Sequence, residues 1–275
     1  MKPAAFDYLQ AATLDEALDL LHEAGGDARV IAGGQSLVPM LNMRLARPAV
    51  LVDIMRIDDL RKIEAEGNDI MIGAGVRQAQ LEAWPDLSAR LPLVAMALPW
   101  IGHVQTRARG TVCGSLAHAD PSAELPLSLI ALQGNLHLRT KRKRRTVAAD
   151  DFFLGMMATE LGEGEMIEAV SLPSRSEGTG YGFNEIGRRH GDFAITAVAA
   201  VVTERSASIA IAGVDDRPRR FDVPLPSDPG LDDALNEIAW DLNARDDIHA
   251  SARYRRELVR RLGRRTIEEA AACLV

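Results

Sequence analysis

The spacing of apolar residues near the start of the chain predicts a helix followed by a short strand. Leucine and alanine recur three or four positions apart between residues 14 and 24, which places them on one face of a helix. Thr13 and Glu16 have the spacing of a capping box at its start, and a Gly-Gly pair ends it. The stretch ARVIAGG (28–34) then predicts a strand that runs into a glycine turn.

The pattern up to residue 173 predicts short strands and helices in alternation. Residues 49–54 form the next apolar strand, so the chain begins as strand, glycine turn, short helix and strand. A second glycine-bearing segment starts at Arg109. Further strands are predicted at 68–75, 135–140, 145–153 and 165–173, and helices at 77–84, 88–101 and 122–133.

The composition changes at 174–182, a stretch of small, polar and glycine residues, and we place a domain boundary there. The predicted domains are 1–175 and 176–275. In the second domain, 192–202 and 207–214 are apolar strands separated by a four-residue turn, which predicts an antiparallel hairpin. The patterns of 231–242 and 251–274 are helical.

Length and composition indicate a globular protein with a substantial core. The chain has 275 residues, 47% of them hydrophobic and 26% charged, which fits one large domain or two smaller ones. No stretch approaches eighteen apolar residues, and the N-terminus lacks the apolar core of a secretory signal. We therefore expect a cytoplasmic protein that does not insert into a membrane.

Charge and cysteine content narrow the possible chemistry. The formal net charge of -7 argues against a nucleic-acid partner. Cys113 and Cys273 are far apart and have no cysteine or histidine neighbour at metal-ligand spacing, so neither a disulfide framework nor a metal site is expected. If the protein handles electrons, the carrier is then an organic cofactor.

Two glycine segments are candidates for binding the phosphate groups of a ligand. Successive backbone N–H groups at a glycine turn form a concave nest for phosphate oxygens, and a helix N-terminus nearby adds partial positive charge. The first segment offers Gly33 and Gly34 followed by two side-chain donors, and the second offers Gly114 and Ser115. Either alone is more often a plain tight turn, but both together favour a dinucleotide site. Neither has the Rossmann or the Walker spacing, so a different dinucleotide fold is implied.

These residues also carry a resemblance to a known family. VIAGGQSLVPMLNMRLARPAVLVDI (30–54) and RGTVCGSLAHADPSAELP (109–126) resemble the two flavin-binding motifs of the FAD-binding medium subunit of molybdenum hydroxylases, the carbon monoxide dehydrogenase and xanthine dehydrogenase family. GYGFNEIGRRHGDFAITAVAAVV (180–202) resembles the start of the C-terminal flavoprotein domain of that family. The three motifs occur in the family's order and span nearly the whole chain.

The resemblance implies a set of FAD-binding residues. The first loop would surround the pyrophosphate, Glu124 would accept hydrogen bonds from cofactor hydroxyls, and two isoleucines would pack on the rings. The predicted residues are Val30, Ile31, Ala32, Gly33, Gly34, Gln35, Ser36, Leu37, Ile101, Thr111, Gly114, Ser115, His118, Asp120, Glu124, Ile167 and Asn184.

Several of these positions also have a plainer interpretation. His118 is more often a structural hydrogen-bond partner than a catalyst, and Asp120 is as well placed to cap the next helix as to contact a cofactor. Ile101 and Asn184 stand where some relatives have an aromatic residue and a lysine, which leaves the electron acceptor open. Cys113 is expected to be a small buried hydrophobe. No catalytic residue is assigned.

Two basic stretches are predicted to be solvated or to face a partner subunit. The run RTKRKRR (139–145) is a candidate hairpin end or a contact for an acidic partner. The arginines of SARYRRELVRRLGRR (251–265) cover one side of a helix, which is either solvated or an interface.

The resemblance implies an α+β fold. Residues 1–175 would form a two-subdomain FAD-binding domain of the p-cresol methylhydroxylase and CO dehydrogenase flavoprotein type, and 176–275 an antiparallel sheet with helices. FAD would take electrons from [2Fe-2S] clusters on a small partner subunit, with molybdopterin on a large one, in a heterotrimer that dimerises.

Two alternatives remain open at this point. A stand-alone FAD-dependent reductase of the same broad fold would use NADPH and would need a general acid in its own substrate domain. A nucleotide-binding module without enzymatic activity would need the two loops alone. The sequence does not select the substrate of the complex, which could be carbon monoxide, a purine, an N-heterocycle or an aldehyde. It does not select the terminal electron acceptor either, which could be NAD, oxygen, a quinone or a cytochrome.

Overall fold

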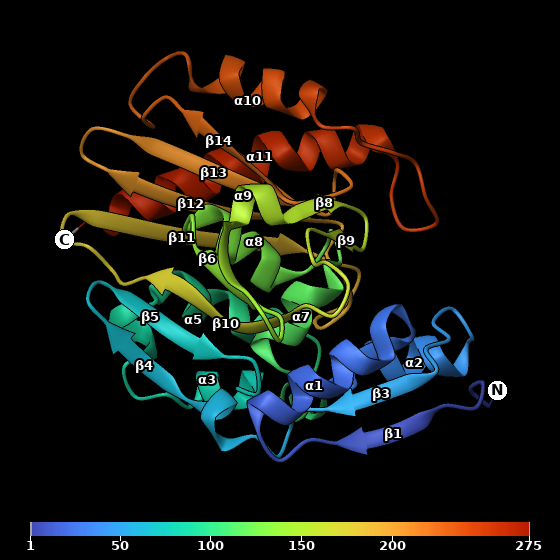
Figure 1. Ribbon diagram of the computed structural model, residues 1–275. Coiled ribbons are helices and arrows are strands. Elements are labelled where there is room, and N and C mark those ends of the chain that lie inside the picture. The colour runs from blue at the N-terminus through green and yellow to red at the C-terminus, as the bar shows by residue number, and fades with distance from the viewer. Residues whose placement is uncertain (1, 275) are drawn as a thin grey trace.

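The computed structural model describes residues 2–274, in which three main sheets follow one another along the chain (Figure 1). The first is a parallel three-stranded sheet in the order β1 (Asp7–Gln10), β3 (Val50–Asp53), β2 (Ala28–Ile31). Its connections contain α1 (Leu14–Ala24), the 3-10 turn η1 (Gly25–Asp27) and α2 (Leu37–Asn42). The helix predicted at 14–24 is confirmed, with Thr13 as its N-cap.

The second sheet is antiparallel and has five strands. Their order is β4 (Ile63–Glu66), β5 (Asp69–Gly73), β10 (Met166–Pro173), β6 (Asn135–Arg139) and β7 (Arg144–Ala148). The turn η2 (Asp58–Arg61) precedes β4. The segments between the strands form α3 (Gln78–Glu82), α4 (Leu87–Arg90), α5 (Pro92–Ala97), η3 (Leu98–Trp100), α6 (Val104–Arg107), α7 (Val112–His118), α8 (Glu124–Ala131) and α9 (Ala149–Phe152). A small hairpin, β8 (Phe153–Gly155) and β9 (Ala158–Thr159), follows α9.

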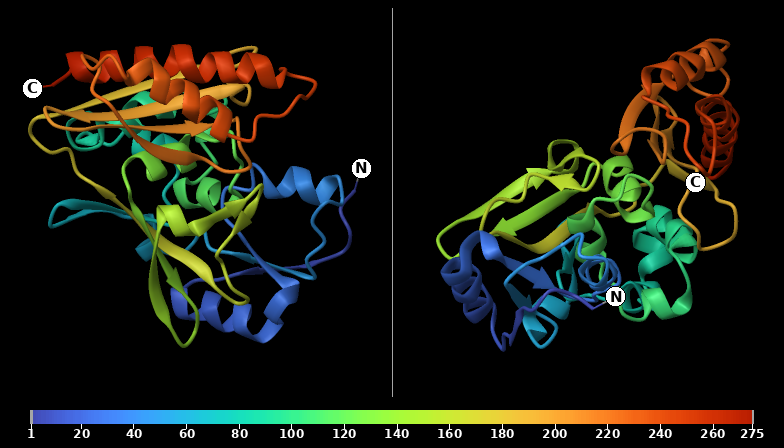
Figure 2. Two further views of the ribbon diagram at one scale, coloured as in Figure 1. Left: turned by 90° about the horizontal axis from the view of Figure 1, so that it is seen from above. Right: turned by 90° about the vertical axis from the view of Figure 1, so that its right-hand side faces the viewer.

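The third sheet is an antiparallel meander of β11 (Thr179–Ile186), β12 (Thr196–Thr203), β13 (Ala207–Ala212) and β14 (Arg219–Val223). Two helices, α10 (Leu231–Asp241) and α11 (Ala252–Ala272), lie together on one side of it (Figure 2). Ala207 pairs with Val202, which confirms the predicted hairpin. The α+β fold class is confirmed.

Three predictions of local structure were wrong in part. Residues 88–101 form α4, α5 and η3 in place of one helix, because Pro92 and Pro99 lack the N–H that a helix interior requires and each begins a new turn. Residues 145–153 do not form one strand, since α9 separates β7 from β8. The end of the polar boundary segment proved to be the start of β11, which no pattern had indicated.

The third sheet lies between α5 and α8 on one face and α10 and α11 on the other. On its inner face β12 and β13 present Ala197, Ala199, Ala210 and Ala212, which belong to the same core as α5 and α8. On its outer face the larger side chains of the same strands pack on α10 and α11. Small residues inside let α8 approach the sheet closely. The division of the chain at 175/176 stays a prediction.

No helix within residues 2–274 is both long and apolar enough to cross a membrane. The cytoplasmic location predicted from the sequence stays a prediction.

A glycine of β11 controls how α11 packs on the outer face. A Cβ at Gly180 would overlap the carbonyl oxygen of Ala270 in α11. We expect Gly180→Ala to lower the free energy of unfolding by about 1–3 kcal/mol or more, because the helix must move away from the sheet. Urea denaturation followed by circular dichroism measures this. Gly155→Ala is the control, since a Cβ there has no atom within 4 Å; equal stability of the two variants would contradict the explanation.

Candidate cofactor-binding site

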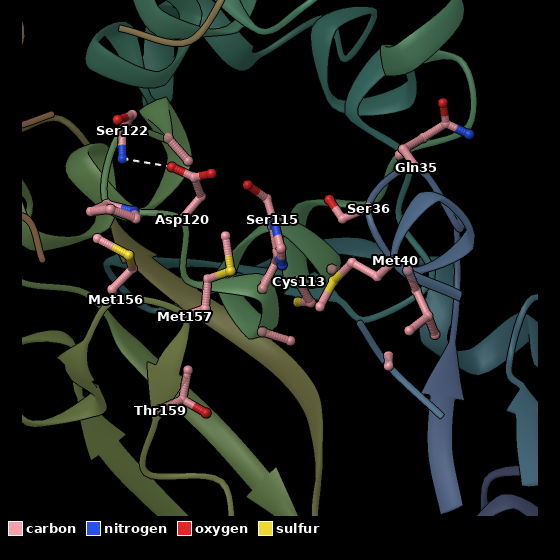
Figure 3. A pocket seen from close by; sticks show the side chains of 18 of the residues that line it. Gln35, Ser36, Met40, Cys113, Ser115, Asp120, Ser122, Met156, Met157 and Thr159 are labelled. Carbon is pink, nitrogen blue, oxygen red and sulfur yellow. Dashed lines mark hydrogen bonds between the residues drawn. The ribbon is translucent and has the colours of Figure 1, made fainter. Parts of the chain in front are cut away.

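A cleft of about 1480 Å³ lies where the three sheets meet. Residues of the glycine turn after β2, including Gln35 and Ser36, line one wall, and Ser115 of α7 lies at its centre (Figure 3). Met156 and Met157, from the β8–β9 hairpin, form the opposite side. The loops before β12, after β13 and between α10 and α11 complete the lining. The cleft is large enough for an extended cofactor, because drug-sized ligands occupy about 300–1,000 Å³.

The first glycine turn leaves a row of unused donors. Within residues 2–274, the backbone N–H groups of Gly33, Gly34, Gln35 and Ser36 donate to no protein oxygen. Gly34 has a φ of 71°, in the left-handed region that favours glycine. The side chain of Gln35 folds back, and its Nε2 donates to the carbonyl of Gly33 over 3.2 Å. Four free N–H groups in succession form the nest that an anion requires.

The second glycine segment meets the first directly. A Cβ at Gly33 would overlap the carbonyl oxygen of Arg109, so only glycine allows the two backbones to lie this close. Thr111 caps α7, and its Oγ1 accepts the N–H of Gly114 over 3.0 Å. A Cβ at Gly114 would lie 2.6 Å from that oxygen. Close backbone approach therefore joins the segments at one end of the cleft.

Asp120, in the turn that follows α7, was predicted either to cap the next helix or to contact a cofactor. Its Oδ1 accepts the N–H of Ser122 over 2.8 Å, which closes a turn two residues before the start of α8 (Figure 3). Asp120 thus shapes the approach to α8 and is not its N-cap, which is Ala123. Its side chain also lines the cleft.

The structure brings nearly all the predicted site residues together. Two do not line this cleft: Ile31 lines a smaller cavity behind the glycine turn, and Asn184 faces α11. Nδ2 of Asn184 donates to Thr266 over 3.1 Å and to Glu269 over 2.6 Å. The others line the cleft: Val30, Ala32, Gly33, Gly34, Gln35, Ser36, Leu37, Ile101, Thr111, Gly114, Ser115, His118, Asp120, Glu124 and Ile167. We therefore remove Asn184 from the proposed binding residues, because the pleat of β11 directs it to the opposite face.

Sequence reasoning missed two buried polar residues, one of which lines the cleft. Gln78 lines it and is 4% exposed, and Glu185 on β11 is 6% exposed. Glu185 follows Tyr181 and Phe183 at spacings of two, so the alternation of a strand would have placed it on the inner face had β11 been recognised. Its Oε2 has no hydrogen-bond partner among the described residues.

Burial makes two carboxyl groups weaker acids than an ordinary glutamate. Desolvation at the start of α8 raises the pKa of Glu124 to about 7, and the charge of Asp120 adds to the effect. Desolvation likewise raises the pKa of Glu185 to about 8, with a further contribution from the charge of Glu124. Both groups therefore hold protons well above the ordinary range of a glutamate.

Cys113 is a buried hydrophobe, as expected from the sequence. It is 3% exposed, and desolvation raises the pKa of its thiol to about 12, so that the thiolate does not form at neutral pH.

The basic stretches are largely occupied by ion pairs within the chain. At the β6–β7 hairpin, Arg139 pairs with Glu168 over 2.9 Å, and Lys141 pairs with Asp19 of α1 over 2.8 Å. Arg145 pairs with Glu165 over 2.7 Å. The pair of Lys141 with Asp19 ties the hairpin to α1 of the first sheet, whereas the other two pairs tie it to β10 and the segment before it. On α11, Arg261 and its neighbours pair with acidic residues of the same helix and of α10.

Comparison with known proteins agrees with this architecture. Residues 4–175 match the family described as "FAD binding domain in molybdopterin dehydrogenase", and residues 181–270 match "CO dehydrogenase flavoprotein C-terminal domain". The chain is 40% identical to the nicotine 6-hydroxylase medium subunit of Paenarthrobacter nicotinovorans, over 99% of both chains.

Solved structures of the same type share the whole fold. A chain of the reconstituted CO dehydrogenase from Oligotropha carboxidovorans superposes with a TM-score of 0.95 at 33% identity, over 99% of this chain and 100% of the other. A chain of quinoline 2-oxidoreductase from Pseudomonas putida 86 gives 0.90 at 32% identity, over 99% of each. The protein is thus a flavoprotein of the α+β type with a C-terminal sheet domain. It belongs to the FAD-binding medium subunits of the molybdenum hydroxylase family.

The raised pKa values predict how the stability of the chain depends on pH. The folded chain holds more protons than the unfolded chain from about pH 4.5 to about pH 8, so its stability falls as pH rises through this window. We expect Glu185→Gln to reduce that fall by an amount on the order of 2 kcal/mol, with little effect at about pH 5.

Urea denaturation at several pH values measures this difference. The matched control is Glu177→Gln, which removes an exposed carboxylate from the segment before β11 and should retain the original slope. A variant at Glu185 whose stability still falls as steeply as that of the unchanged protein would contradict the assignment.

Proposed function

We propose that this chain is the electron-transfer subunit of a molybdenum hydroxylase complex, receiving electrons from the iron–sulfur clusters of a partner and delivering them to a terminal acceptor. The observation that carries the proposal is the row of free N–H groups at Gly33–Ser36, held against the second glycine segment by a contact that only glycine allows. A backbone nest of this kind would hold the pyrophosphate of FAD in a chain whose net charge is -7, and arginines such as Arg29 and Arg188 also line the cleft.

The other lining residues fit the remaining parts of FAD. Ile101 and Ile167, 8% and 5% exposed, give the cleft apolar surface for the rings. Thr111, Ser115 and Asp120 offer polar atoms near the second glycine segment. The proposed binding residues are Val30, Ala32, Gly33, Gly34, Gln35, Ser36, Leu37, Ile101, Thr111, Gly114, Ser115, His118, Asp120, Glu124 and Ile167, with Ile31 supporting the turn from behind.

The residues of the cleft would position the cofactor and control its exposure to water. FAD, when bound, supplies a group that accepts and releases electrons. The nest and the cap of α7 would hold the phosphates, and the buried Ile101 and Ile167 would exclude water from the rings. Met156 and Met157 remain 57% and 52% exposed at the rim, which leaves one side of the cleft accessible to a partner or an acceptor.

The partners are proposed from the family. The relatives are named as the medium subunit or medium chain of an enzyme, and we infer that this chain likewise joins a small subunit with [2Fe-2S] clusters and a large subunit with molybdopterin. We propose a heterotrimer that dimerises in the cytoplasm. The names of the relatives include nicotine and carbon monoxide, so they indicate no single substrate for the complex.

Purification of the protein from its native host tests the proposal as a whole. We expect a visible flavin spectrum, FAD in the supernatant after acid precipitation, and two co-purifying subunits that contain iron–sulfur clusters and molybdenum. Oxidation of NADPH by the isolated chain would instead favour the stand-alone reductase. A colourless chain without partners would leave only the nucleotide-binding module.

Substitution of the two key glycines tests the site. Gly33→Val and Gly114→Val should each lower the FAD content at least tenfold, because a side chain separates the two segments or displaces Thr111. FAD per chain is measured after acid release, and circular dichroism confirms that the variants fold. Gly155→Val is the control, since its side chain enters open space outside the cleft. Full FAD content in both cleft variants would exclude the assignment.

A further inference from the structure

Three loops in the C-terminal part of the chain form one wall of the cleft, which we call the C-terminal wall. They are the loop before β12 (188–195), the loop after β13 (213–216) and the loop between α10 and α11 (243–249). Residues of all three line the cleft. Because these loops lie outside the helices and strands, their positions relative to one another depend on contacts between the loops.

One buried arginine makes such contacts with all three loops. Arg255 lies in the first turn of α11, is 6% exposed and lines the cleft. Its Nη1 donates over 2.5 Å to the carbonyl of Ile195, at the end of the first loop, and over 2.5 Å to that of Gly213, in the second. Its Nη2 donates over 2.6 Å to Oδ2 of Asp247, in the third. A single guanidinium therefore joins three segments that are distant in the sequence.

The two carbonyls that Arg255 binds lie close together because position 213 is a glycine. Gly213 has a φ of 79°, and a Cβ there would lie 2.8 Å from the carbonyl oxygen of Ala194 and 2.9 Å from that of Ile195. Neighbouring carbonyl oxygens repel each other, and an acceptor that is removed from water and left without a donor is costly. The planar guanidinium supplies an N–H to each carbonyl in a fixed geometry, which the point charge of a lysine does not.

Gly213 also connects the C-terminal wall to the second glycine segment. Its N–H donates over 2.8 Å to the carbonyl of Pro121. Pro121 lies between Asp120 and Ser122, whose hydrogen bond closes the turn after α7. A movement of the loop after β13 would therefore displace the turn that carries Asp120 into the lining of the cleft.

Asp247 shapes the third loop around the same guanidinium. Its Oδ1 accepts the N–H groups of His249 and Ala250 over 2.8 and 2.9 Å, while its Oδ2 accepts from Arg255. A second ion pair, between Arg245 and Asp216 over 2.8 Å, also joins this loop to the one after β13. The side chains of that pair are 58% and 38% exposed, so water screens it and it contributes little. The buried guanidinium is the stronger connection.

We propose that Arg255 is a positioning residue that holds the C-terminal wall against the second glycine segment and so pre-organises the cleft for FAD. The inference rests on the proposed function and deepens it, because it assigns part of the affinity for FAD to the C-terminal part of the chain. Without the guanidinium, FAD would have to order three loops when it binds, and the conformational entropy lost in that ordering weakens binding. Arg255 need not touch the cofactor for this effect.

Replacement of two arginines of α11 tests the proposal in the complex purified from its host. The dissociation constant of FAD is measured by equilibrium dialysis. We expect Arg255→Ala to raise it at least about tenfold, because the cost of ordering the loops is then added to binding. Arg253→Ala is the matched control: the exposed Arg253 lies two residues earlier on α11, and its replacement should change the constant by less than about twofold.

Chemical rescue separates positioning from a general loss of stability. Ethylguanidinium carries the planar group that Arg255→Ala removes, and it can enter from the cleft that Arg255 lines. At millimolar concentration it should restore most of the lost affinity for FAD, whereas ethylammonium should not. Arg255→Lys should bind FAD nearly as weakly as Arg255→Ala. A lower free energy of unfolding in urea together with an unchanged dissociation constant would overturn the proposal.

A milder variant covers the case in which Arg255→Ala does not fold. Asp247→Asn keeps the shape of the side chain but removes the charge that binds the guanidinium, and should raise the dissociation constant about threefold. An unchanged constant in that variant, or equal effects of Arg253→Ala and Arg255→Ala, would also overturn the proposal. An unaltered complex that holds no FAD would instead contradict the proposed function itself.

Discussion

The contact between two stretches of bare backbone holds the site together. Gly33 lies against the carbonyl of Arg109 so closely that no side chain fits, and this contact joins the parallel sheet to the segment that leads into α7. It fixes the orientation of the unused N–H groups in the first turn relative to the Thr111 cap in the second. The cleft, its lining and the proposed cofactor site all depend on that spacing.

A second close approach, between α8 and the third sheet, joins the C-terminal part of the chain to the rest. Alanines on the inner face of β12 and β13 let α8 pack into the sheet, and the loop before α8 is tied to the loop after β13 by the N–H of Gly213 and the carbonyl of Pro121, 2.8 Å apart. The inner face of the third sheet is therefore part of the FAD-domain core.

The electrostatics of the chain are organised locally. Its overall charge is negative, and several basic residues of the β6–β7 hairpin form ion pairs with α1 and with Glu165 and Glu168. The groups of the cleft that favour an anion are the backbone dipoles of the first glycine turn and the arginines of the lining, Arg29, Arg47, Arg188, Arg245 and Arg255.

The sequence by itself determined the features that depend on neighbours along the chain. The capped helix at 14–24, the apolar strands beside it, the two glycine segments and the hairpin of β12 and β13 follow from local spacing and turn chemistry. Tertiary structure decided the rest. The pleat of β11 turned Asn184 toward α11, and the close approach of Gly33 to Arg109 brought the two glycine segments to one cleft. Close approach and burial arise between segments far apart in the sequence, and no local pattern records which partner each will meet.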